Sequence, residues 1–272
     1  MKPFHPGPLI TLTTDFGLAD HYVGTMKGVL LSRCPGVQLV DISHEIPPFS
    51  IYSGAYTIDQ AAPYFPSGTI HVIVVDPGVG TARKPLLVEA LGQSFIAPDN
   101  GVLSMILKRD TEAKVREITN RELWTSSPSS TFHGRDIFAP VAAALASGTV
   151  KPDKAGPILA KLELLPDLDV LEIKPGQWQG KLLSVDRFGN AITNFCSGAF
   201  AKLATSRFRL AVGNHRITTF QSTFGEAPDG LCFAYFGSSG YIELAVKEQS
   251  AAHLLNAAPG DSIILRLLDL HK

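Results

Sequence analysis

The sequence predicts a protein of the α/β class in which an α/β domain precedes a smaller all-β domain. Strand-like and helix-like segments alternate in the first half, which is typical of βαβ units around a mostly parallel sheet. The second half contains short strand-like segments at close spacing, which is typical of a β-sandwich or barrel. With 272 residues, of which 45% are hydrophobic and 18% charged, the chain can bury a substantial core.

The two halves meet in a proline-containing stretch with little periodicity, from residue 151 to about residue 180. Domain boundaries usually fall in such segments because few contacts cross them. We assign residues 166–178 to a linker. This assignment leaves an N-terminal α/β domain over residues 1–165 and a C-terminal domain over residues 179–272.

Strands and helices are expected to alternate in the N-terminal domain. The third strand is apolar and β-branched along its length, so it should be buried at the centre of the sheet. Proline or glycine follows each helix, and Pro140 is tolerated because it lies in a first helical turn. The expected strands are 9–13, 37–42 and 69–75, and the expected helices are 22–33, 51–64 and 139–147.

The C-terminal domain should consist of short strands separated by turns. Its apolar and β-branched runs are too short for helices and are bounded by Gly, Asn, Asp and Ser. The expected strands are 179–185, 191–194, 208–212, 231–235, 241–246 and 262–267.

Charge and cysteine content exclude several classes of protein. The formal net charge is −1 and no Lys/Arg-rich run occurs, which argues against nucleic acid or a membrane surface as the main partner. Three widely spaced cysteines without a CxxC pair predict neither a disulfide framework nor a thiolate metal site, and they fit a reducing compartment. No signal-type apolar core and no stretch of about 18 apolar residues is found. We therefore expect a cytoplasmic protein.

The most informative motif is Val75-Asp-Pro-Gly-Val-Gly-Thr-Ala-Arg83, directly after the third expected strand. Asp76 should lie where that strand opens into a loop, and ligands gather at the carboxyl ends of strands in open α/β sheets. The segment alone fits two interpretations equally. Asp76 either binds a ligand, with Arg83 nearby, or caps its own turn.

Two more motifs of the first half place charged groups at segment ends. Asp15 follows the first strand and Asp20 precedes the next helix; they fit ribose recognition or, equally, a turn former and a helix N-cap. No GxGxxG accompanies them, so phosphate binding is unsupported. His133 lies next to a glycine and fits a catalytic or a structural role equally. Arg135 and Asp136 fit an ion pair or a helix cap better than catalysis.

Two segments of the second half could contact a nucleoside substrate. In Val185-Asp-Arg-Phe-Gly-Asn190, an asparagine amide suits the edge of a purine and Phe188 offers a flat face. In Gly237-Ser-Ser-Gly240, hydroxyl and backbone N–H groups suit a carboxylate. Each segment alone is more commonly a β-turn.

Six segments together resemble a known family. They are TTDFG, DISHEIPPFSIYSGAY, DPGVGTARK, FHGRDIFAP, DRFGNAITN and SSGYIELA, in this order over nearly the whole chain. They are similar to the S-adenosyl-L-methionine (SAM) hydrolases, also called SAM hydroxide adenosyltransferases, which are homologous to the SAM-dependent fluorinase and chlorinase. The resemblance implies a Rossmann-like N-terminal domain, a C-terminal β-barrel and a homotrimer with active sites between subunits. It also implies that water displaces methionine from C5′ of SAM and yields adenosine.

The resemblance also implies residue roles. The water-activating set falls on Asp76, Arg83 and His133. Residues implied to contact substrate are Asp15 (ribose), Asp20 and Asp186 (methionine amine), Phe49 (sugar and adenine), Phe188, Asn190, Glu243 and Val246 (adenine), and Ser238 and Ser239 (methionine carboxylate). The fluorinase has an arginine where Ser239 aligns, so that contact departs from its pattern.

Asp76 favours hydrolysis over halogenation, because a carboxylate repels halide and accepts a hydrogen bond from water. The fluorinase has a tyrosine there, and its halide-contacting threonine aligns with Val79, which lacks a hydroxyl. We expect no metal or cofactor, because the sulfonium leaving group departs as a neutral thioether.

Two rival classes remain. A metal-dependent hydrolase could use Asp15, Asp76, Asp99 and His133 as ligands, but no HxH or HExxH spacing supports it. A non-catalytic adenosine or SAM sensor would not need the complete water-activating set.

Overall fold

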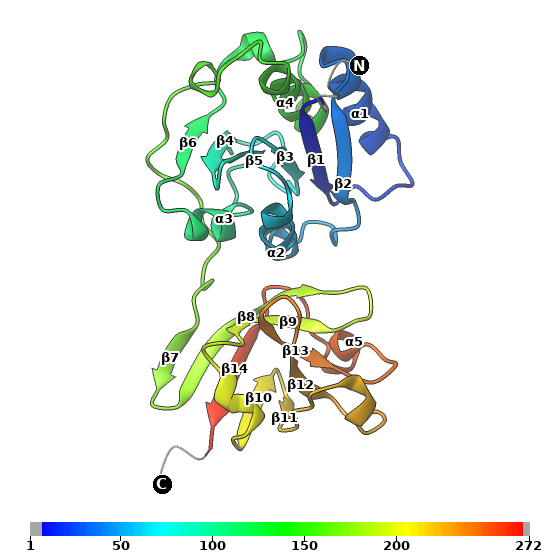
Figure 1. Cartoon of the computed structure of the whole chain (residues 1–272), viewed down its shortest axis with the longest axis vertical. Coiled ribbons are helices and arrows are strands. Elements are labelled where there is room, and N and C mark those ends of the chain that lie inside the picture. Colours follow the sequence, from blue (N-terminus) through cyan, green and yellow to red (C-terminus); the bar gives the residue numbers. More distant parts are fainter. Residues whose placement is uncertain (1–6, 269–272) are drawn as a thin grey trace, which may run out of the picture. The chain divides into compact units, whose positions relative to one another are not determined.

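Residues 7–268 are described by a computed structural model of the chain (Figure 1). The chain forms two compact units, one up to Leu165 and one from Pro166 onward. Each unit has its own sheet and its own hydrophobic core. None of the helices within residues 7–268 combines the length and the apolar character needed to cross a membrane.

The N-terminal unit is built on a mixed sheet. Its strands are β1 (Leu9–Thr14), β2 (Gln38–Ser43), β3 (Ile70–Val74), β4 (Pro85–Ala90), β5 (Gln93–Pro98) and β6 (Lys114–Glu117). The six strands lie in the order β2-β1-β3-β5-β4-β6. The first four in this order run parallel, whereas β4 is antiparallel to β5 and β6. β3 is buried throughout between β1 and β5, which confirms the predicted central strand.

Helices cover both faces of this sheet (Figure 1). On one face, α1 (Tyr22–Arg33) and α4 (Ala139–Ala146) pack with β1 and β3 around a core that includes Met26 and Val72. On the other face, α2 (Ile51–Ala61) and α3 (Ser104–Arg109) pack around Ile58 and Phe95. Short 3₁₀ turns cover Ala62–Tyr64, Arg121–Leu123 and Pro152–Lys154, and a π-helical turn covers Gly134–Phe138.

The segment between the third strand and α4 contains β4, β5, β6 and α3, which the sequence patterns did not predict. β4 begins at a proline and pairs with β5 across a two-residue turn at Leu91 and Gly92. β6 and α3 are only four and six residues long. Elements this short give too few residues for a hydrophobic period to stand out.

The C-terminal unit is an antiparallel sheet that wraps around one apolar core, as a barrel does (Figure 1). Its strands are β7 (Leu171–Lys174), β8 (Gln177–Val185), β9 (Ala191–Cys196), β10 (Phe208–Val212), β11 (His215–Ile217), β12 (Phe233–Phe236), β13 (Tyr241–Ala245) and β14 (Ser262–Leu267), with 3₁₀ turns at Ala201–Ala204 and Phe224–Glu226 and a short helix α5 (Ala251–Leu255). The order is β11-β10-β14-β8-β9-β13-β12, with β7 added beside β8. The predicted α/β class with a following β-barrel is confirmed.

The segment 166–178, which we assigned to a linker, contains a strand. β7 lies inside it and pairs antiparallel with β8, where Leu171 is opposite Gln179. All four residues of β7 are exposed, and its alternation of Leu171 and Ile173 with charged residues is too short to identify a strand from the sequence. Backbone pairing with β8, which propensity does not reveal, orders this segment.

Candidate active site

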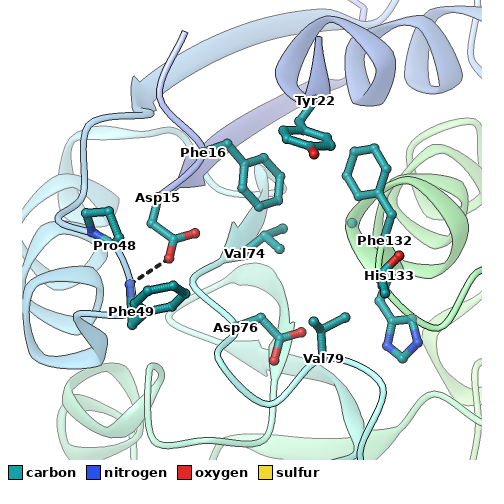
Figure 2. A pocket seen from close by; sticks show the side chains of 12 residues that line it. Asp15, Phe16, Tyr22, Pro48, Phe49, Val74, Asp76, Val79, Phe132 and His133 are labelled. Atoms are coloured by element: carbon teal, nitrogen blue, oxygen red, sulfur yellow. Dashed lines mark hydrogen bonds between the residues drawn. The ribbon is translucent and has the colours of Figure 1, made fainter. Parts of the chain in front are cut away.

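A cavity of about 290 Å³ opens where β1 and β3 end in the N-terminal unit. Asp15, Asp76 and His133 reach it from separate segments of the chain (Figure 2). The full lining consists of Asp15, Phe16, Tyr22, Pro48, Phe49, Val74, Asp76, Val79, Thr131, Phe132, His133 and Gly134. The position agrees with the rule that ligands bind at the carboxyl ends of strands in α/β sheets.

Asp76, Arg83 and His133 form one hydrogen-bonded cluster. The Arg83 Nε donates to Asp76 Oδ1 at 2.9 Å, and Nη2 donates to the other carboxylate oxygen. The same Nη2 lies 2.9 Å from His133 Nδ1. Because the side chains of Arg83 and Asp76 are only 8% and 5% exposed, water screens this pair weakly. The predicted water-activating set is therefore assembled in space.

Arg83 has a different place from its two partners. Asp76 and His133 line the cavity, whereas Arg83 is not among its lining residues in the described part of the chain. Its guanidinium is stacked over the Phe138 ring, 5.2 Å from the centroid. Arg83 therefore contacts both the carboxylate and the imidazole without itself lining the cavity.

Two turns and one amide hold Asp76 at the end of β3. The Val79 N–H donates to the Asp76 carbonyl at 3.2 Å, and the Thr81 N–H donates to the Gly78 carbonyl at 3.2 Å. The Asn100 amide donates to the carbonyl of Val75, directly before Asp76, at 2.9 Å. These bonds fix the backbone on both sides of the carboxylate.

The π-helical turn Gly134–Phe138 follows His133 directly. Its register is shown by the Ala139 N–H, which donates to the Gly134 carbonyl five residues earlier. Gly134 is closely packed, because a Cβ there would lie 3.0 Å from the Met26 sulfur and that side chain would have to shift. Such single π turns often occur at functional sites.

Burial and the neighbouring charges determine the protonation of His133. Burial lowers the pKa of this imidazole, and the positive charge of Arg83 lowers it further, while Asp76 and Asp136 oppose the change. A guanidinium only donates hydrogen bonds, so the His133 Nδ1 that faces Arg83 must accept. The ring is therefore neutral and carries its hydrogen on Nε2.

Asp15 and Phe49 are joined across the cavity wall. The Phe49 N–H donates to Asp15 Oδ2 at 2.9 Å. Phe49 has a positive φ of 68° and is 71% exposed, a left-handed backbone that is uncommon outside glycine and concentrates at functional sites. Burial raises the pKa of the Asp15 carboxyl, the Phe49 N–H opposes this, and Asp76 adds to it.

An aromatic cluster forms one wall of the cavity (Figure 2). The Phe16 and Phe132 rings lie 5.8 Å apart, edge to face, and Tyr22 lies 5.7 Å from Phe16 and 5.2 Å from Phe132. Sequence analysis missed these three residues. Phe16 and Phe132 are direct neighbours of Asp15 and His133 in the motifs TTDFG and FHGRD, and this adjacency was the available signal.

Several other predicted residues lie away from the cavity lining. Asp20 is exposed, and α1 has His21 at its N-cap, so the N-cap interpretation of Asp20 is wrong. Arg135 and Asp136 form the expected ion pair, with two contacts of 2.7 Å. Asp99 accepts the Glu163 N–H at 3.0 Å. Within residues 7–268 no group of three or more His, Cys, Asp or Glu side chains is arranged to hold a metal ion, so the rival ligand set is not assembled.

In the C-terminal unit, Asp186 organises the loop between β8 and β9. Its Oδ1 accepts the N–H groups of Phe188 and Asn190 at 2.9 and 2.8 Å, and its Oδ2 accepts the Asn190 amide at 2.7 Å. Asn190 is buried, whereas the Phe188 side chain is 79% exposed. The loop therefore exposes the Phe188 ring, while the buried Asn190 amide and the Asp186 carboxylate bond to each other.

Glu243 centres a second polar cluster in this unit. Tyr235 donates its hydroxyl to one carboxylate oxygen, and the Ser239 hydroxyl donates to the other at 3.0 Å. Gly237 allows the approach, because a Cβ there would lie 1.9 Å from the Glu243 carboxylate. The single hydroxyl hydrogen of Ser239 is thus committed to Glu243. Ser238 is exposed and Val246 is buried.

Comparison with known proteins extends over both units. Residues 10–156 match the family model of the SAM hydroxide adenosyltransferase N-terminal domain, and residues 180–264 match that of the C-terminal domain. A protein of Thermus thermophilus named (R)-S-adenosyl-L-methionine hydrolase is 40% identical over 91% of this chain and 95% of its own length. A protein of the same name from Salinispora arenicola is 38% identical over 94% of this chain and 97% of its own length.

More distant relatives and a solved structure agree with this match. The fluorinase of Nocardia brasiliensis is 28% identical over 96% of this chain and 97% of its own length. The crystal structure of an uncharacterized conserved protein from Thermotoga maritima superposes with a TM-score of 0.83 at 36% identity, and the match covers 94% of this chain and 99% of that one. Both domains, in this order and over nearly the full length, show that the chain belongs to the SAM hydroxide adenosyltransferase family.

Proposed function

We propose that this protein hydrolyses SAM to adenosine and L-methionine by attack of water at C5′. The observation that carries the proposal is the Asp76–Arg83–His133 cluster, with Asp76 and His133 on a cavity wall that also holds Asp15. The names of the relatives at 38% and 40% identity support the same reaction. They also support the (R) configuration at the sulfonium of the substrate.

The chemistry follows from the hydrogen bonds of the cluster. Each oxygen of the Asp76 carboxylate has two acceptor sites, so the carboxylate can accept a hydrogen bond from water while Arg83 holds it. His133 can donate Nε2–H to the same water. As the water oxygen forms its bond to C5′, the C5′–S bond breaks and its electron pair stays on the sulfur of methionine. The water proton passes to Asp76. General-base catalysis of this kind increases the reaction rate about 10²- to 10⁴-fold.

The cavity wall favours water over halide as the nucleophile. Asp76 is a carboxylate, which repels an anion, and the neighbouring Val79 offers no hydroxyl to a halide. The position of the water also matters. Holding its oxygen in line with the leaving group can lower the activation free energy by several kcal/mol, because less orientational entropy is lost in reaching the transition state.

We further assign contacts to the remaining residues. Asp15 accepts hydrogen bonds from the ribose hydroxyls, and Phe49 packs over the sugar. The family resemblance supports these roles, together with adenine and methionine contacts from Asp20, Asp186, Phe188, Asn190, Ser238, Glu243 and the backbone at Val246. Ser239 is the exception, since its hydroxyl donates to Glu243 and its part in carboxylate binding is indirect.

We also propose a homotrimeric, metal-independent and cofactor-free enzyme of the cytoplasm. The family resemblance supports the trimer. The positive leaving group supports a reaction without a metal, and the free state of Cys34, Cys196 and Cys232 supports a reducing compartment. Light scattering of the purified protein tests the trimer, and assay in the presence of a chelator tests the metal requirement.

The decisive experiment is incubation with (R)-SAM in ¹⁸O-labelled water, with and without chloride, followed by chromatography with mass detection. We expect ¹⁸O in adenosine and release of methionine in both conditions. A chlorinated nucleoside would identify a halogenase instead. Binding of SAM without any product would identify a sensor.

A further inference from the structure

A chain of polar side chains runs from the cavity wall into the N-terminal unit. The Phe16 N–H donates to Thr14 Oγ1 at 3.3 Å, and Thr14 Oγ1 lies 2.9 Å from His44 Nδ1. On its other side, His44 Nε2 lies 3.1 Å from Asp41 Oδ1, although the angle is not that of a well-directed hydrogen bond. Lys27 completes the chain at 2.5 Å from the second Asp41 oxygen. Thr14 and His44 are 0% and 4% exposed.

The hydrogen-bond donors and acceptors along this row of side chains can be assigned one after another. A carboxylate only accepts, so the Nε2 of His44 that faces Asp41 carries the ring hydrogen. With a neutral ring, Nδ1 accepts from the Thr14 hydroxyl, and Thr14 Oγ1 accepts the Phe16 N–H. Thr14 Oγ1 thus donates to His44 and accepts from Phe16, whereas His44 Nε2 makes only a close polar contact with Asp41. Buried polar networks of this kind fix one conformation.

The same segment ties the backbone around Asp15. The Gly17 N–H donates to the His44 carbonyl at 2.8 Å, and the Phe49 N–H donates to the Asp15 carboxylate at 2.9 Å. Bonds before and after Asp15 therefore join it to the connection between β2 and α2. That connection also supplies Phe49 to the cavity wall.

We propose that His44 is a positioning residue for nucleoside recognition, which acts by holding Thr14 and the Asp15–Gly17 turn so that the Asp15 carboxylate meets the ribose hydroxyls. This inference rests on the proposed function, because it requires a nucleoside in the cavity. His44 is not on the cavity wall among the described residues, so it acts through Asp15.

The test compares adenosine with 2′,3′-dideoxyadenosine, which lacks both hydroxyls that Asp15 would contact. Calorimetry gives the dissociation constant of each ligand, and their ratio measures recognition of the diol. We expect His44→Phe, which has an aromatic ring but no ring nitrogen, to weaken adenosine binding about tenfold, the effect of about 1.4 kcal/mol. Binding of the dideoxynucleoside should change little, so the ratio falls.

Two further variants separate positioning from general stability. His44→Asn keeps an acceptor near the Nδ1 position and should restore the wild-type ratio. Thr14→Val removes the hydroxyl with little change of shape and should lower the ratio as His44→Phe does. The double variant should be no worse than either single one, because both changes break one shared interaction. Thr14→Val also serves as the test if His44→Phe does not fold.

The outcomes are distinct. The positioning role would be overturned if His44→Phe and Thr14→Val left the ratio of the two dissociation constants unchanged, whether or not both nucleosides bound more weakly. A wild-type protein that does not distinguish the two nucleosides would instead contradict the ribose role of Asp15 and with it the proposed function. Hydrolysis of SAM by each variant, measured as kcat and KM, adds a second readout, and we expect the change mainly in KM.

Discussion

The predicted site residues are arranged differently in the two units. In the N-terminal unit, Asp15, Asp76 and His133 come from distant segments and meet in one cavity, with Arg83 buried behind two of them. In the C-terminal unit, the predicted residues lie in two separate loops and on or next to β13. There Asp186 bonds to its own loop and Ser239 bonds to Glu243.

The proposed roles divide in the same way, with reaction chemistry in the Asp76–Arg83–His133 cluster and recognition of the base in the C-terminal loops. Reactive groups must be held by parts of the fold that move little, and strand ends in a central sheet meet that need. Recognition of a base requires only an oriented amide and an exposed ring, which one local loop can supply. We therefore expect substitutions in the Asp76–Arg83–His133 cluster to affect turnover, and substitutions at Asp15 or in the C-terminal loops to affect binding.

The largest effect is expected for Asp76→Asn. The amide keeps the shape but removes the proton acceptor, so kcat should fall about 10²- to 10⁴-fold, while adenosine binding changes by less than about threefold. Asp99→Asn is the matched control, because Asp99 also follows a buried strand but does not line the cavity within the described residues. Full activity in Asp76→Asn would remove the proposed mechanism, and loss of activity in Asp99→Asn would revive the metal-ligand hypothesis.

Arg83→Gln should reduce kcat about 10²-fold, because small misplacements of catalytic groups have effects of that size. It should also change the pH profile. The Arg83 charge helps to lower the pKa of His133, so its removal raises that pKa, and the acid limb of kcat should move to higher pH. If the acid limb of the kcat profile of Arg83→Gln stayed at the wild-type pH, protonation of His133 would not be the cause of that limb.

The next effect concerns stability and again distinguishes the units. Burial lowers the pKa of His71 in β3 to about 4, whereas the unfolded chain titrates near 6.5. The unfolded state binds more protons in this window, so stability is full above about pH 6.5 and falls by about 3 kcal/mol as the pH drops to about 4. The described histidines of the C-terminal unit, His215 and His253, are exposed.

Urea denaturation between pH 7 and 4 measures this loss, and hydrogen exchange locates it. His71→Asn should be less stable at pH 7, because it leaves space in the core, but its stability should depend less on pH. An equally steep pH dependence in the variant would assign the acid sensitivity to other groups.

A smaller effect is expected for Phe188→Ala. Stacking of a base on an aromatic ring contributes about 1–3 kcal/mol, so adenosine should bind about tenfold more weakly while the melting temperature stays constant. Tyr64→Ala is the control, because Tyr64 is 89% exposed and lies in the other unit. A loss of kcat at saturating SAM would contradict the division between chemistry and recognition.

The smallest effect is expected for Ser239→Ala. Because its hydroxyl donates to Glu243, the KM for SAM should rise by no more than about threefold. A rise of more than about thirtyfold, measured at the same ionic strength, would show that Ser239 contacts the substrate directly.

The sequence was most informative where local pattern and burial coincide. The long apolar run before Asp76 predicted the central strand, and the family resemblance implied the set of Asp76, Arg83 and His133. Local pattern carried no information on which of these side chains faces the cavity, because that depends on how β3 and the π turn are packed. For the same reason Tyr22, one helical residue among many, was not identified.

His44 shows a different limit of sequence reasoning. It lies in DISHEIPPFSIYSGAY, a segment that carried the family resemblance, yet its partners Thr14 and Asp41 belong to two different strands. Only the parallel pairing of β1 with β2, with Leu12 opposite Asp41, brings the three together. β7 was missed for a related reason, since its exposed residues are ordered by pairing alone.

The π turn at Gly134–Phe138 restricts how the chain length can vary here. Each residue of a helix turns the following side chain by about 100° and advances it by 1.5 Å. A one-residue deletion that converted this turn to α-helix would therefore rotate His133 about the axis of α4 by roughly a quarter of a circle and remove its imidazole from Arg83. Substitutions within the segment leave this register unchanged, whereas insertions and deletions shift it, so relatives of this protein that keep the histidine should show no alignment gap between it and α4.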